Sequence, residues 1–267
     1  MAGGVSSVEV VKDGATGLEK LVLREAHGCS VQVFLYGGQV IFWENEYREQ
    51  LLFVSRKAYF KPPKAIRGGI QICFPQFGNH GVLEQHGFAR NRLWSVDETP
   101  PPFPATTSNC HIDLILKQSP EDLKIWPNSE VRVEGLETLD YIDNLQCGKR
   151  CTEQGDAVVF ESEAEKVYLS APPKIVIIDH DKKRTFELRK EGLPDVVVWN
   201  PWDRKAKTIL DFGEEEYKCM LCVGAANAEK PITLRPGEEW QGRQEISVVP
   251  SNSEGIKNAW PVAPIAI

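Results

Sequence analysis

The chain has 267 residues, of which 42% are hydrophobic and 26% are charged, as in an ordinary soluble globular protein. Its formal net charge of −7 argues against non-specific nucleic-acid binding, which requires basic surfaces. Residues 1–7 lack the features of a signal peptide, and no apolar run approaches the roughly 20 residues that span a bilayer. We therefore expect a cytoplasmic protein whose partners include neither nucleic acid nor membrane.

The N-terminal part of the chain has the pattern of short strands. Residues 8–11, 20–24, 30–35 and 39–43 are rich in β-branched and aromatic side chains, and turns that contain glycine separate them. The pattern returns at residues 131–134, 156–161 and 196–199, and residues 174–179 and 185–189 predict a hairpin around a polar turn. Only residues 119–126 resemble a helical turn. These features predict an all-β fold, a large antiparallel β-sandwich, in one domain over residues 1–267.

The seven cysteines are irregularly spaced, which favours reduced thiols in a chain without a secretion signal. Cys219 and Cys222 form a CxxC pair within a predicted strand, where the two side chains would point to opposite faces. No second Cys/His pair with suitable spacing accompanies it. The sequence therefore predicts no metal site and no cofactor.

Residues 67–91 are the most informative segment, because Arg67, Gln85, His86 and Arg90 lie there among several glycines. A guanidinium offers a planar fork of donors that fits phosphate or sugar hydroxyls, and histidine titrates near neutral pH. Glycine lets the backbone approach a ligand closely. The segment predicts a pocket for a small anionic or polyhydroxy ligand. The alternative is that the arginines form surface ion pairs and the histidine occupies a turn.

Catalysis is less well supported than binding. General acid–base chemistry needs a second titratable group opposite the histidine, and no carboxylate pair stands out by its spacing. The carboxylates are many, Asp195 and Glu229 among them, and we expect most of the set to be solvated. Among the other histidines only His80 is near the segment. Trp199 and Trp202 follow an apolar run and could stack on a sugar, although we favour a place in the core for both.

The segment at residues 67–91 resembles the glucose-6-phosphate 1-epimerases, or hexose-6-phosphate mutarotases, of the aldose 1-epimerase superfamily. Further motifs at residues 134–145, 198–202 and 232–240 carry the same resemblance, which runs over most of the chain and is closest to the plant branch. It implies a galactose-mutarotase-like supersandwich. It also implies metal-free interconversion of the α and β anomers of a hexose 6-phosphate.

In that family a histidine acid protonates the ring oxygen while a glutamate base takes the proton of the anomeric hydroxyl, so that the ring opens and can close on either face. The resemblance implies that Arg67, Gln85 and Arg90 are substrate-binding residues and that His86 assists binding. Glu165 falls on a substrate-binding aspartate position. The implied partner is a hexose 6-phosphate or another small sugar, bound by a monomer.

Three positions depart from the family pattern. A block with several strands and the catalytic acid histidine is absent where Ser129 runs into Glu130, so central strands of the sandwich are expected to be missing. Gly224 stands where the family has its catalytic glutamate and cannot act as a base. Glu165 is one methylene longer than the family's aspartate, which is the mildest change. Because a general acid or base contributes roughly 10²–10⁴-fold to a rate, we expect weak or no mutarotase activity.

Replacement of the lost groups by neighbours is not expected. As a strand residue Glu229 would point to the face opposite Gly224, and nothing positions His80. Three hypotheses remain open: an epimerase-family enzyme that is weakened or dead, a non-catalytic binder of sugar phosphates, and a truncated splice product without a stable fold.

Overall fold

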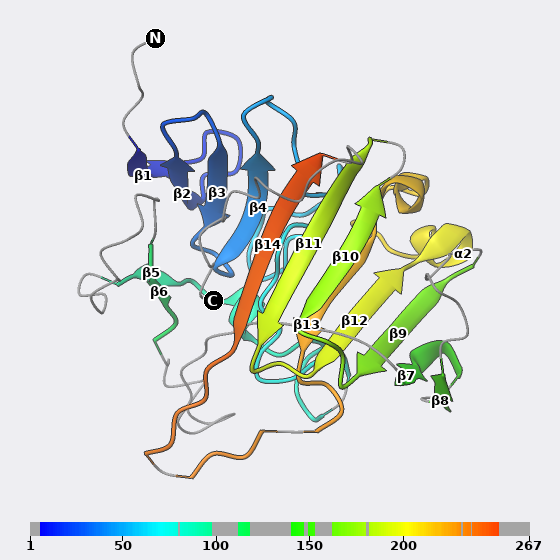
Figure 1. Ribbon diagram of the computed structural model, residues 1–267. Helices are drawn as coiled ribbons and strands as arrows, with labels where there is room; N and C mark the ends of the chain where they lie inside the picture. The colour runs from blue at the N-terminus through cyan, green and yellow to red at the C-terminus, as the bar shows by residue number, and fades with distance from the viewer. Residues whose placement is uncertain are drawn as a thin grey trace. The chain divides into compact units, whose positions relative to one another are not determined.

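The computed structural model describes residues 6–79, 81–97, 112–117, 140–146, 149–152, 162–179, 182–230, 232–235 and 237–250 (Figure 1). The predictions for residues 119–126, 131–134 and 156–161, for His80 and for the junction at Ser129 lie outside these ranges. Across the described residues the chain consists mostly of strands in antiparallel sheets, with one short α-helix. The prediction of an all-β fold is confirmed.

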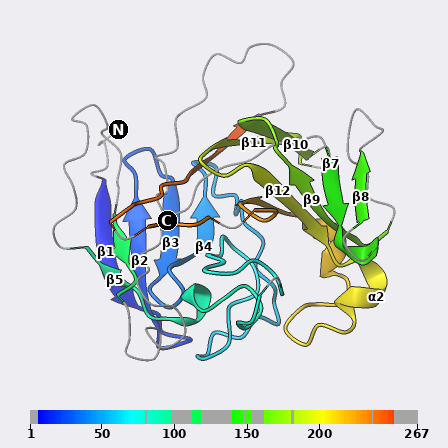
Figure 2. The ribbon, with the colours of Figure 1, turned by 90° about the horizontal axis from the view of Figure 1, so that it is seen from below.

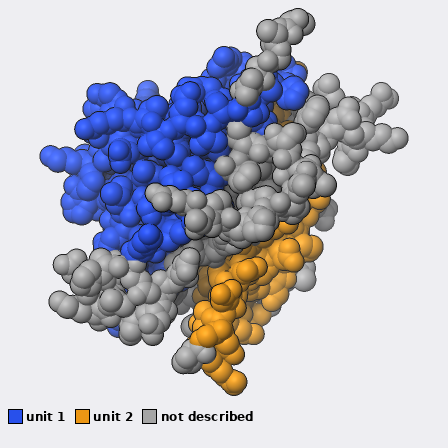
Figure 3. Space-filling view, turned by 90° about the vertical axis from the view of Figure 1, so that its left-hand side faces the viewer, with its two compact units in different colours: residues 1–131, 210–213, 267 blue, residues 132–209, 214–266 orange. Residues whose placement is uncertain are grey.

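The chain divides into two compact units (Figure 3). Unit 1 comprises residues 1–131, 210–213 and 267, and unit 2 comprises residues 132–209 and 214–266. The short segment at residues 210–213 therefore belongs to unit 1 although its neighbours on both sides in the sequence belong to unit 2. The single domain predicted from the sequence stays a prediction.

Unit 1 contains a four-stranded antiparallel sheet whose strands lie side by side in chain order (Figure 2). The strands are β1 (Ser7–Lys12), β2 (Glu19–Arg24), β3 (Ser30–Phe34) and β4 (Gln39–Glu44), with a bulge between β3 and β4 at Gln32/Val33. A two-stranded sheet pairs β5 (Ser95–Val96) with β6 (Leu114–Ile115), and a 3₁₀ turn, η1, spans Ala89–Asn91. All four strands predicted from the first 43 residues are therefore confirmed.

The apolar side of this sheet supports the loop that precedes Arg67. Phe34 and Tyr36 pack with the fully buried Ile66, and the rings of Phe34 and Phe60 are 5.7 Å apart. Burial of large side chains at the end of this loop stabilises its position, at about 25 cal/mol per Å² of apolar surface removed from water. The backbone of Arg67 is thus held next to the core because Ile66, the preceding residue, is buried there.

Unit 2 contains two antiparallel sheets. The five-stranded sheet has the order β13-β12-β9-β7-β8, and the three-stranded sheet has the order β10-β11-β14. The strands are β7 (Asp140–Asp143), β8 (Lys149–Thr152), β9 (Ala164–Leu169), β10 (Lys174–Asp179), β11 (Arg184–Glu191), β12 (Asp195–Asn200), β13 (Cys222–Ala226) and β14 (Arg243–Pro250). The 3₁₀ turns η2 (Asn144–Gln146) and η3 (Glu216–Cys219) and the helix α2 (Trp202–Ala206) complete the unit.

The two sheets of unit 2 pack face to face, as a β-sandwich requires. Tyr168 of β9 and Val196 and Val198 of β12 form one buried cluster with Leu188 of β11, and Ile246 of β14 packs against it. The predicted hairpin is confirmed, because β10 pairs with β11 from Lys174↔Arg189 to Asp179↔Arg184.

Two expectations for unit 2 are wrong. Cys219 ends η3 and only Cys222 lies in a strand, so the CxxC pair does not lie within one strand; both residues are exposed. Trp199 and Trp202 are half-buried rather than core residues, and the Trp202 ring lies 5.4 Å from the ring of Tyr217.

Two carboxylates also differ from expectation. Glu229 lies beyond the end of β13, not in a strand, and forms an ion pair with Arg150 at 3.5 Å. Asp195 is buried rather than solvated, and it accepts hydrogen bonds from three backbone N–H groups. A carboxylate in this position organises local backbone and is not available to a ligand.

Candidate functional site

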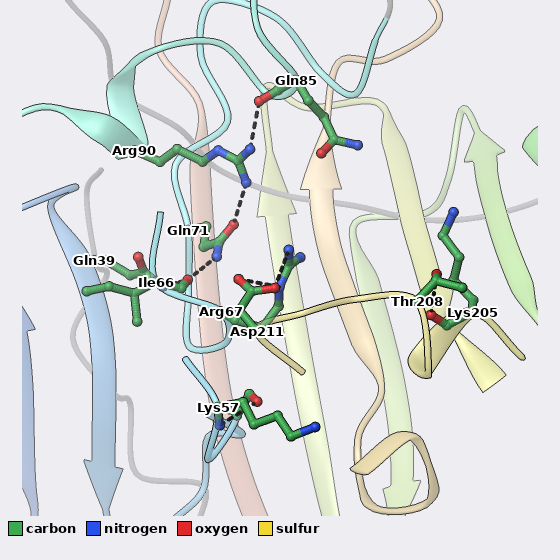
Figure 4. A network of polar contacts seen from close by, with 11 residues as sticks. Gln39, Lys57, Ile66, Arg67, Gln71, Gln85, Arg90, Lys205, Thr208 and Asp211 are labelled. Atoms are coloured by element: carbon green, nitrogen blue, oxygen red, sulfur yellow. Dashed lines mark hydrogen bonds and ion pairs between the residues drawn. The ribbon is translucent and has the colours of Figure 1, made fainter. Parts of the chain in front are cut away.

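Hydrogen bonds hold the backbone around Arg67 from several sides. The N–H of Ser55 donates to the Arg67 carbonyl at 3.0 Å. The buried side-chain amide of Gln39 donates to the carbonyls of Ile66 and Gly68, and the amide of Gln71 also donates to the Ile66 carbonyl (Figure 4). Two glutamines thus hold the carbonyl groups of Ile66 and Gly68, the residues on either side of Arg67.

The Arg67 side chain is paired with Asp211 in unit 1. Its Nε donates to both carboxylate oxygens at 3.3 Å, and its Nη2 donates to Oδ1 at 3.2 Å. The contact therefore uses the Nε/Nη2 edge of the guanidinium (Figure 4). Within the described part of the chain, Nη1 makes no hydrogen bond. One bidentate edge of Arg67 is occupied by the protein, and the Nη1/Nη2 edge is left for another acceptor.

Arg90, in the 3₁₀ turn η1, is held by neutral groups. Its Nη2 donates to the Gln85 carbonyl at 2.7 Å and its Nη1 donates to the Gln71 side-chain carbonyl at 3.3 Å (Figure 4). The Arg90 Nε is buried and has no hydrogen-bond partner among the described residues. Burial lowers the pKa of the Arg90 guanidinium, which remains charged at neutral pH because arginine titrates so far above it. No carboxylate among the described residues neutralises this cation by a direct hydrogen bond.

Gln71 links the Arg90 side chain to the backbone next to Arg67. Its amide nitrogen donates to the carbonyl of Ile66, next to Arg67, and its amide oxygen accepts from Arg90. Because an amide presents a donor on one side and an acceptor on the other, only one of its two orientations satisfies both contacts. The Arg90 guanidinium is therefore connected through Gln71 to the backbone carbonyl that directly precedes Arg67.

His86 is a neutral donor in this arrangement. Its Nδ1 accepts the N–H of Gly78 at 3.1 Å, which places the proton of the neutral ring on Nε2. Burial, with the charges of Arg90 and Arg67, lowers the pKa of His86 to about 4. At neutral pH the imidazole therefore offers one N–H donor and no positive charge.

Gln85 differs from the other three predicted residues because its side chain is exposed (Figure 4). The group it contributes to the network is its backbone carbonyl, which accepts from Arg90. The preceding turn is held by the buried Gln76, whose amide donates to the Gly78 carbonyl and accepts from the N–H of Leu83. The position of Gln85 therefore depends on the hydrogen bond to its own carbonyl and on the turn that the Gln76 side chain holds.

Two glycines of this segment lie against the protein's own backbone. Gly87 has φ +68°, and an added Cβ would lie 2.2 Å from the Phe74 carbonyl oxygen. Gly69 has φ +67°, and an added Cβ would lie 2.1 Å from the Val40 carbonyl oxygen. Both glycines are required because the protein's own backbone passes next to them.

Glu165 and Gly224 lie in unit 2, on one face of the five-stranded sheet. Trp199 of β12 is directly opposite Glu165 of β9 and Cys222 of β13, and Val197 is opposite Gly224. Since residues two apart in a strand share a face, these residues face away from the Val196 and Val198 cluster. Glu165 accepts a hydrogen bond from the Asn144 side chain at 3.2 Å. An added Cβ at Gly224 would have no atom within 4 Å.

The predicted residues thus form two groups. Arg67, Gln85, His86 and Arg90 belong to unit 1, where hydrogen bonds and charges connect them, and Glu165 and the Gly224 position share a sheet face of unit 2. Sequence reasoning missed Asp211 and Gln71. Gln71 lies inside the glycine-rich segment and could have been included, whereas Asp211 is 144 residues from Arg67 and had no local signal.

Neither a metal centre nor a membrane span is found among the described residues. No group of three or more His, Cys, Asp or Glu side chains could hold a metal ion there. No helix in the same ranges is long and apolar enough to cross a membrane.

The fold and the site define a β-sandwich protein with a pair of oriented arginines beside a neutral histidine. The sequence profile of the aldose 1-epimerase family matches residues 19–129 and 116–247. The chain belongs to this family.

Within the family the chain is similar to proteins provisionally named glucose-6-phosphate 1-epimerase. The protein of that name from Cenchrus ciliaris is 55% identical over 292 residues, covering 91% of this chain and 88% of the relative. The one from Escherichia coli strain K12 is 25% identical over 237 residues, covering 73% and 79%. The crystal structure of YeaD, a provisionally assigned mutarotase from Salmonella typhimurium, matches with a TM-score of 0.76 and 22% identity over 92% of this chain and 94% of that chain. The structural likeness supports the predicted mutarotase-like fold.

Proposed function

We propose that this protein binds a hexose 6-phosphate through Arg67, Arg90, His86 and Gln85, and that it exchanges the anomers of this sugar weakly or not at all. The sugar phosphate is suggested by the names of its relatives. The observation that carries the binding proposal is the pair of arginines, each held by hydrogen bonds to its own partners, with one edge of Arg67 still available. A phosphate monoester fits a guanidinium edge bidentately.

His86 is assigned a binding role rather than the role of the acid. With a pKa of about 4 the ring is neutral at pH 7, and its Nε2–H can donate to a hydroxyl or phosphate oxygen without transferring a proton. Ring opening needs one group that protonates the ring oxygen and another that removes the anomeric hydroxyl proton. His86 does not supply the first of these in its neutral form.

The weak-exchange proposal rests on Gly224 and on the break in the sequence near residue 129. Gly224 has no side chain, and space is open where a Cβ would lie. The two segments of the family match meet and overlap at residues 116–129, around the proposed site of the missing block. The alignment with the Cenchrus protein also extends over 292 positions, more than the 267 residues of this chain. Both observations support an internal deletion.

Exchange NMR with glucose 6-phosphate tests the proposal, beside melting curves with and without the sugar phosphate. We expect anomer exchange at or near the spontaneous rate and a melting temperature that rises with ligand, because a ligand that binds the native state stabilises it. Exchange far above the spontaneous rate would show that other groups act as acid and base. A cooperative melt that the ligand does not shift would exclude binding, and no cooperative melt would favour the splice-product hypothesis.

Two pairs of variants separate binding from catalysis. Arg90→Ala should abolish binding of glucose 6-phosphate, whereas Arg48→Ala, which removes an exposed ion pair with Glu44, should leave affinity unchanged. Gly224→Glu should restore little exchange beyond that of Gly224→Gln, which has the same size without the basic carboxylate. Full activity in Gly224→Glu would mean that the missing block is not needed for catalysis.

A further inference from the structure

Asp211 holds one of the two arginines by a specific edge. All three hydrogen bonds between these side chains involve Nε and Nη2 of Arg67, at 3.2–3.3 Å. Side-on pairing of this kind fixes the plane of the guanidinium as well as its position. The Arg67 and Asp211 side chains are 33% and 15% exposed, so the pair is partly shielded from water but reachable by a ligand.

The segment that carries Asp211 is anchored next to the Arg67 backbone. Phe212 is fully buried, and its ring centroid lies 5.7 Å from that of Phe53. The Phe53 carbonyl in turn accepts the N–H of Gly69 at 2.6 Å, two residues after Arg67. The position of Asp211 therefore follows from a buried aromatic neighbour and does not depend on its ion pair with Arg67 alone.

We propose that Asp211 is a positioning residue that aims the Nη1/Nη2 edge of Arg67 at the phosphate of the ligand. This inference rests on the proposed binding of a sugar phosphate. An unrestrained arginine side chain loses rotamer freedom when it binds, and a side chain that is already ordered avoids that cost. The ion pair provides this order in the ligand-free protein. Gln71 and the Gln85 carbonyl do the same for Arg90 through neutral acceptors.

The opposite role for Asp211 would be that of a competitor. A carboxylate beside a binding arginine repels a phosphate, and its removal would then strengthen binding. The geometry favours the positioning role, because Asp211 occupies the Nε edge and leaves the terminal edge, where a second oxyanion can bind. The two roles predict changes of affinity in opposite directions.

The first arm of the test needs no ligand. In ¹⁵N-labelled protein, the Arg67 Nε–Hε signal should be sharp and protected from solvent exchange, because this proton is bound to the carboxylate. It should broaden or exchange faster in Asp211→Ala and, to a smaller extent, in Asp211→Asn, which keeps the shape and one acceptor. An unchanged Arg67 signal in both variants would overturn the proposal.

The second arm measures affinity for glucose 6-phosphate and for inorganic phosphate by calorimetry. We expect Asp211→Asn to weaken binding of both by about tenfold or more, as for loss of a charge-assisted contact, and Asp211→Glu to recover part of it. The matched control is Asp203→Asn, which removes an exposed carboxylate paired with Lys207 in the same region of the chain.

A double-variant cycle separates positioning from a general structural role. If Asp211 acts through Arg67, Asp211→Asn should change affinity little in an Arg67→Lys background, because lysine has no fork to orient. Equal losses in both backgrounds, or tighter phosphate binding in Asp211→Asn, would overturn the inference while the binding proposal stands. Binding of phosphate but not of glucose 6-phosphate would leave the inference intact and overturn the proposed sugar. Binding of neither anion by the unmodified protein would overturn both.

Discussion

His86 combines an uncommon backbone conformation with a depressed pKa. Its φ of +66° is left-handed, and its ring accepts the Gly78 N–H while burial and two arginines keep it neutral. The pKa of this histidine is 6.5 in the unfolded chain and about 4 in the folded protein. Between these values the unfolded state binds more protons, so the free energy of unfolding falls as the pH is lowered.

We predict that His86→Asn flattens this part of the stability profile. Asparagine tolerates left-handed φ and does not titrate. In the unmodified protein the titration of His86 should remove about 1–3 kcal/mol from the free energy of unfolding as the pH falls from 6.5 to 4, and the variant should lack this loss. Urea unfolding at a series of pH values measures the slope. The exposed His27, changed to Gln, is the control. An unaltered slope in His86→Asn would show that the pKa of His86 is not depressed.

Gly87 and Gly224 make a matched pair of glycine substitutions. Gly87→Ala should destabilise the protein by about 2 kcal/mol or more, because the methyl group meets the Phe74 carbonyl and φ is positive. Gly224→Ala should be neutral or stabilising by up to about 1 kcal/mol, since the strand is regular and the space is open. Melting temperatures of the two variants test this. Equal losses would contradict the space inferred at Gly224.

Among the elements, β12 depends on one buried carboxylate. Asp195, at the start of β12, is 2% exposed and accepts the N–H groups of Ala228 at 2.8 Å, Glu229 at 3.0 Å and Ser170 at 3.3 Å. These hydrogen bonds connect the residues that follow β13 and β9 to β12, which lies between those two strands in the sheet.

We predict that Asp195→Ala lowers the free energy of unfolding by about 2–3 kcal/mol, because buried N–H groups lose their acceptor. Asp195→Asn keeps one acceptor oxygen and should cost less. Asp203→Ala removes an exposed carboxylate and should cost about 0.5 kcal/mol or less. Urea denaturation compares the three, and a loss in Asp195→Ala no larger than that in Asp203→Ala would refute the assignment.

For the molecule as a whole, we consider the segment at residues 210–213, which belongs to unit 1 although it lies within the sequence of unit 2. It adds the buried Phe212 and the Arg67 partner Asp211 to unit 1, while the chain on both sides belongs to unit 2. Unfolding of unit 2 would therefore pull on both ends of residues 210–213, and unfolding of unit 1 would release these residues from their packing. We expect the two units to unfold together.

Calorimetry tests this coupling. The intact protein should show one transition with equal calorimetric and van't Hoff enthalpies, and Phe212→Ala should lower stability by about 3–5 kcal/mol as for a large buried aromatic. Leu210→Ala, a change at an exposed position beside it, is the control. Two separate transitions in the intact protein would contradict the coupling and also the single domain predicted from the sequence.

Local sequence patterns were sufficient for many of the strands and for the binding segment. β1 to β4 and the β10–β11 hairpin follow from alternation and turn residues, which act over a few positions. β9 was not predicted, because its Glu165 and Lys166 are residue types depleted in strands and only pairing with β7 and β12 stabilises it there. Arg67, His86 and Arg90 could be grouped because one short segment contains all three.

Contacts between distant parts of the chain could be learned only from the tertiary structure. Asp211 meets Arg67 across 144 residues because Phe212 is buried beside Phe53, and no local pattern encodes such a pairing. The neutral state of His86 depends on burial and on two arginines brought close by folding. Gly224 and Glu165 share a face because the register of β12 with its two neighbours aligns them. Residue types fix which chemistry is possible, whereas burial and register decide which groups meet.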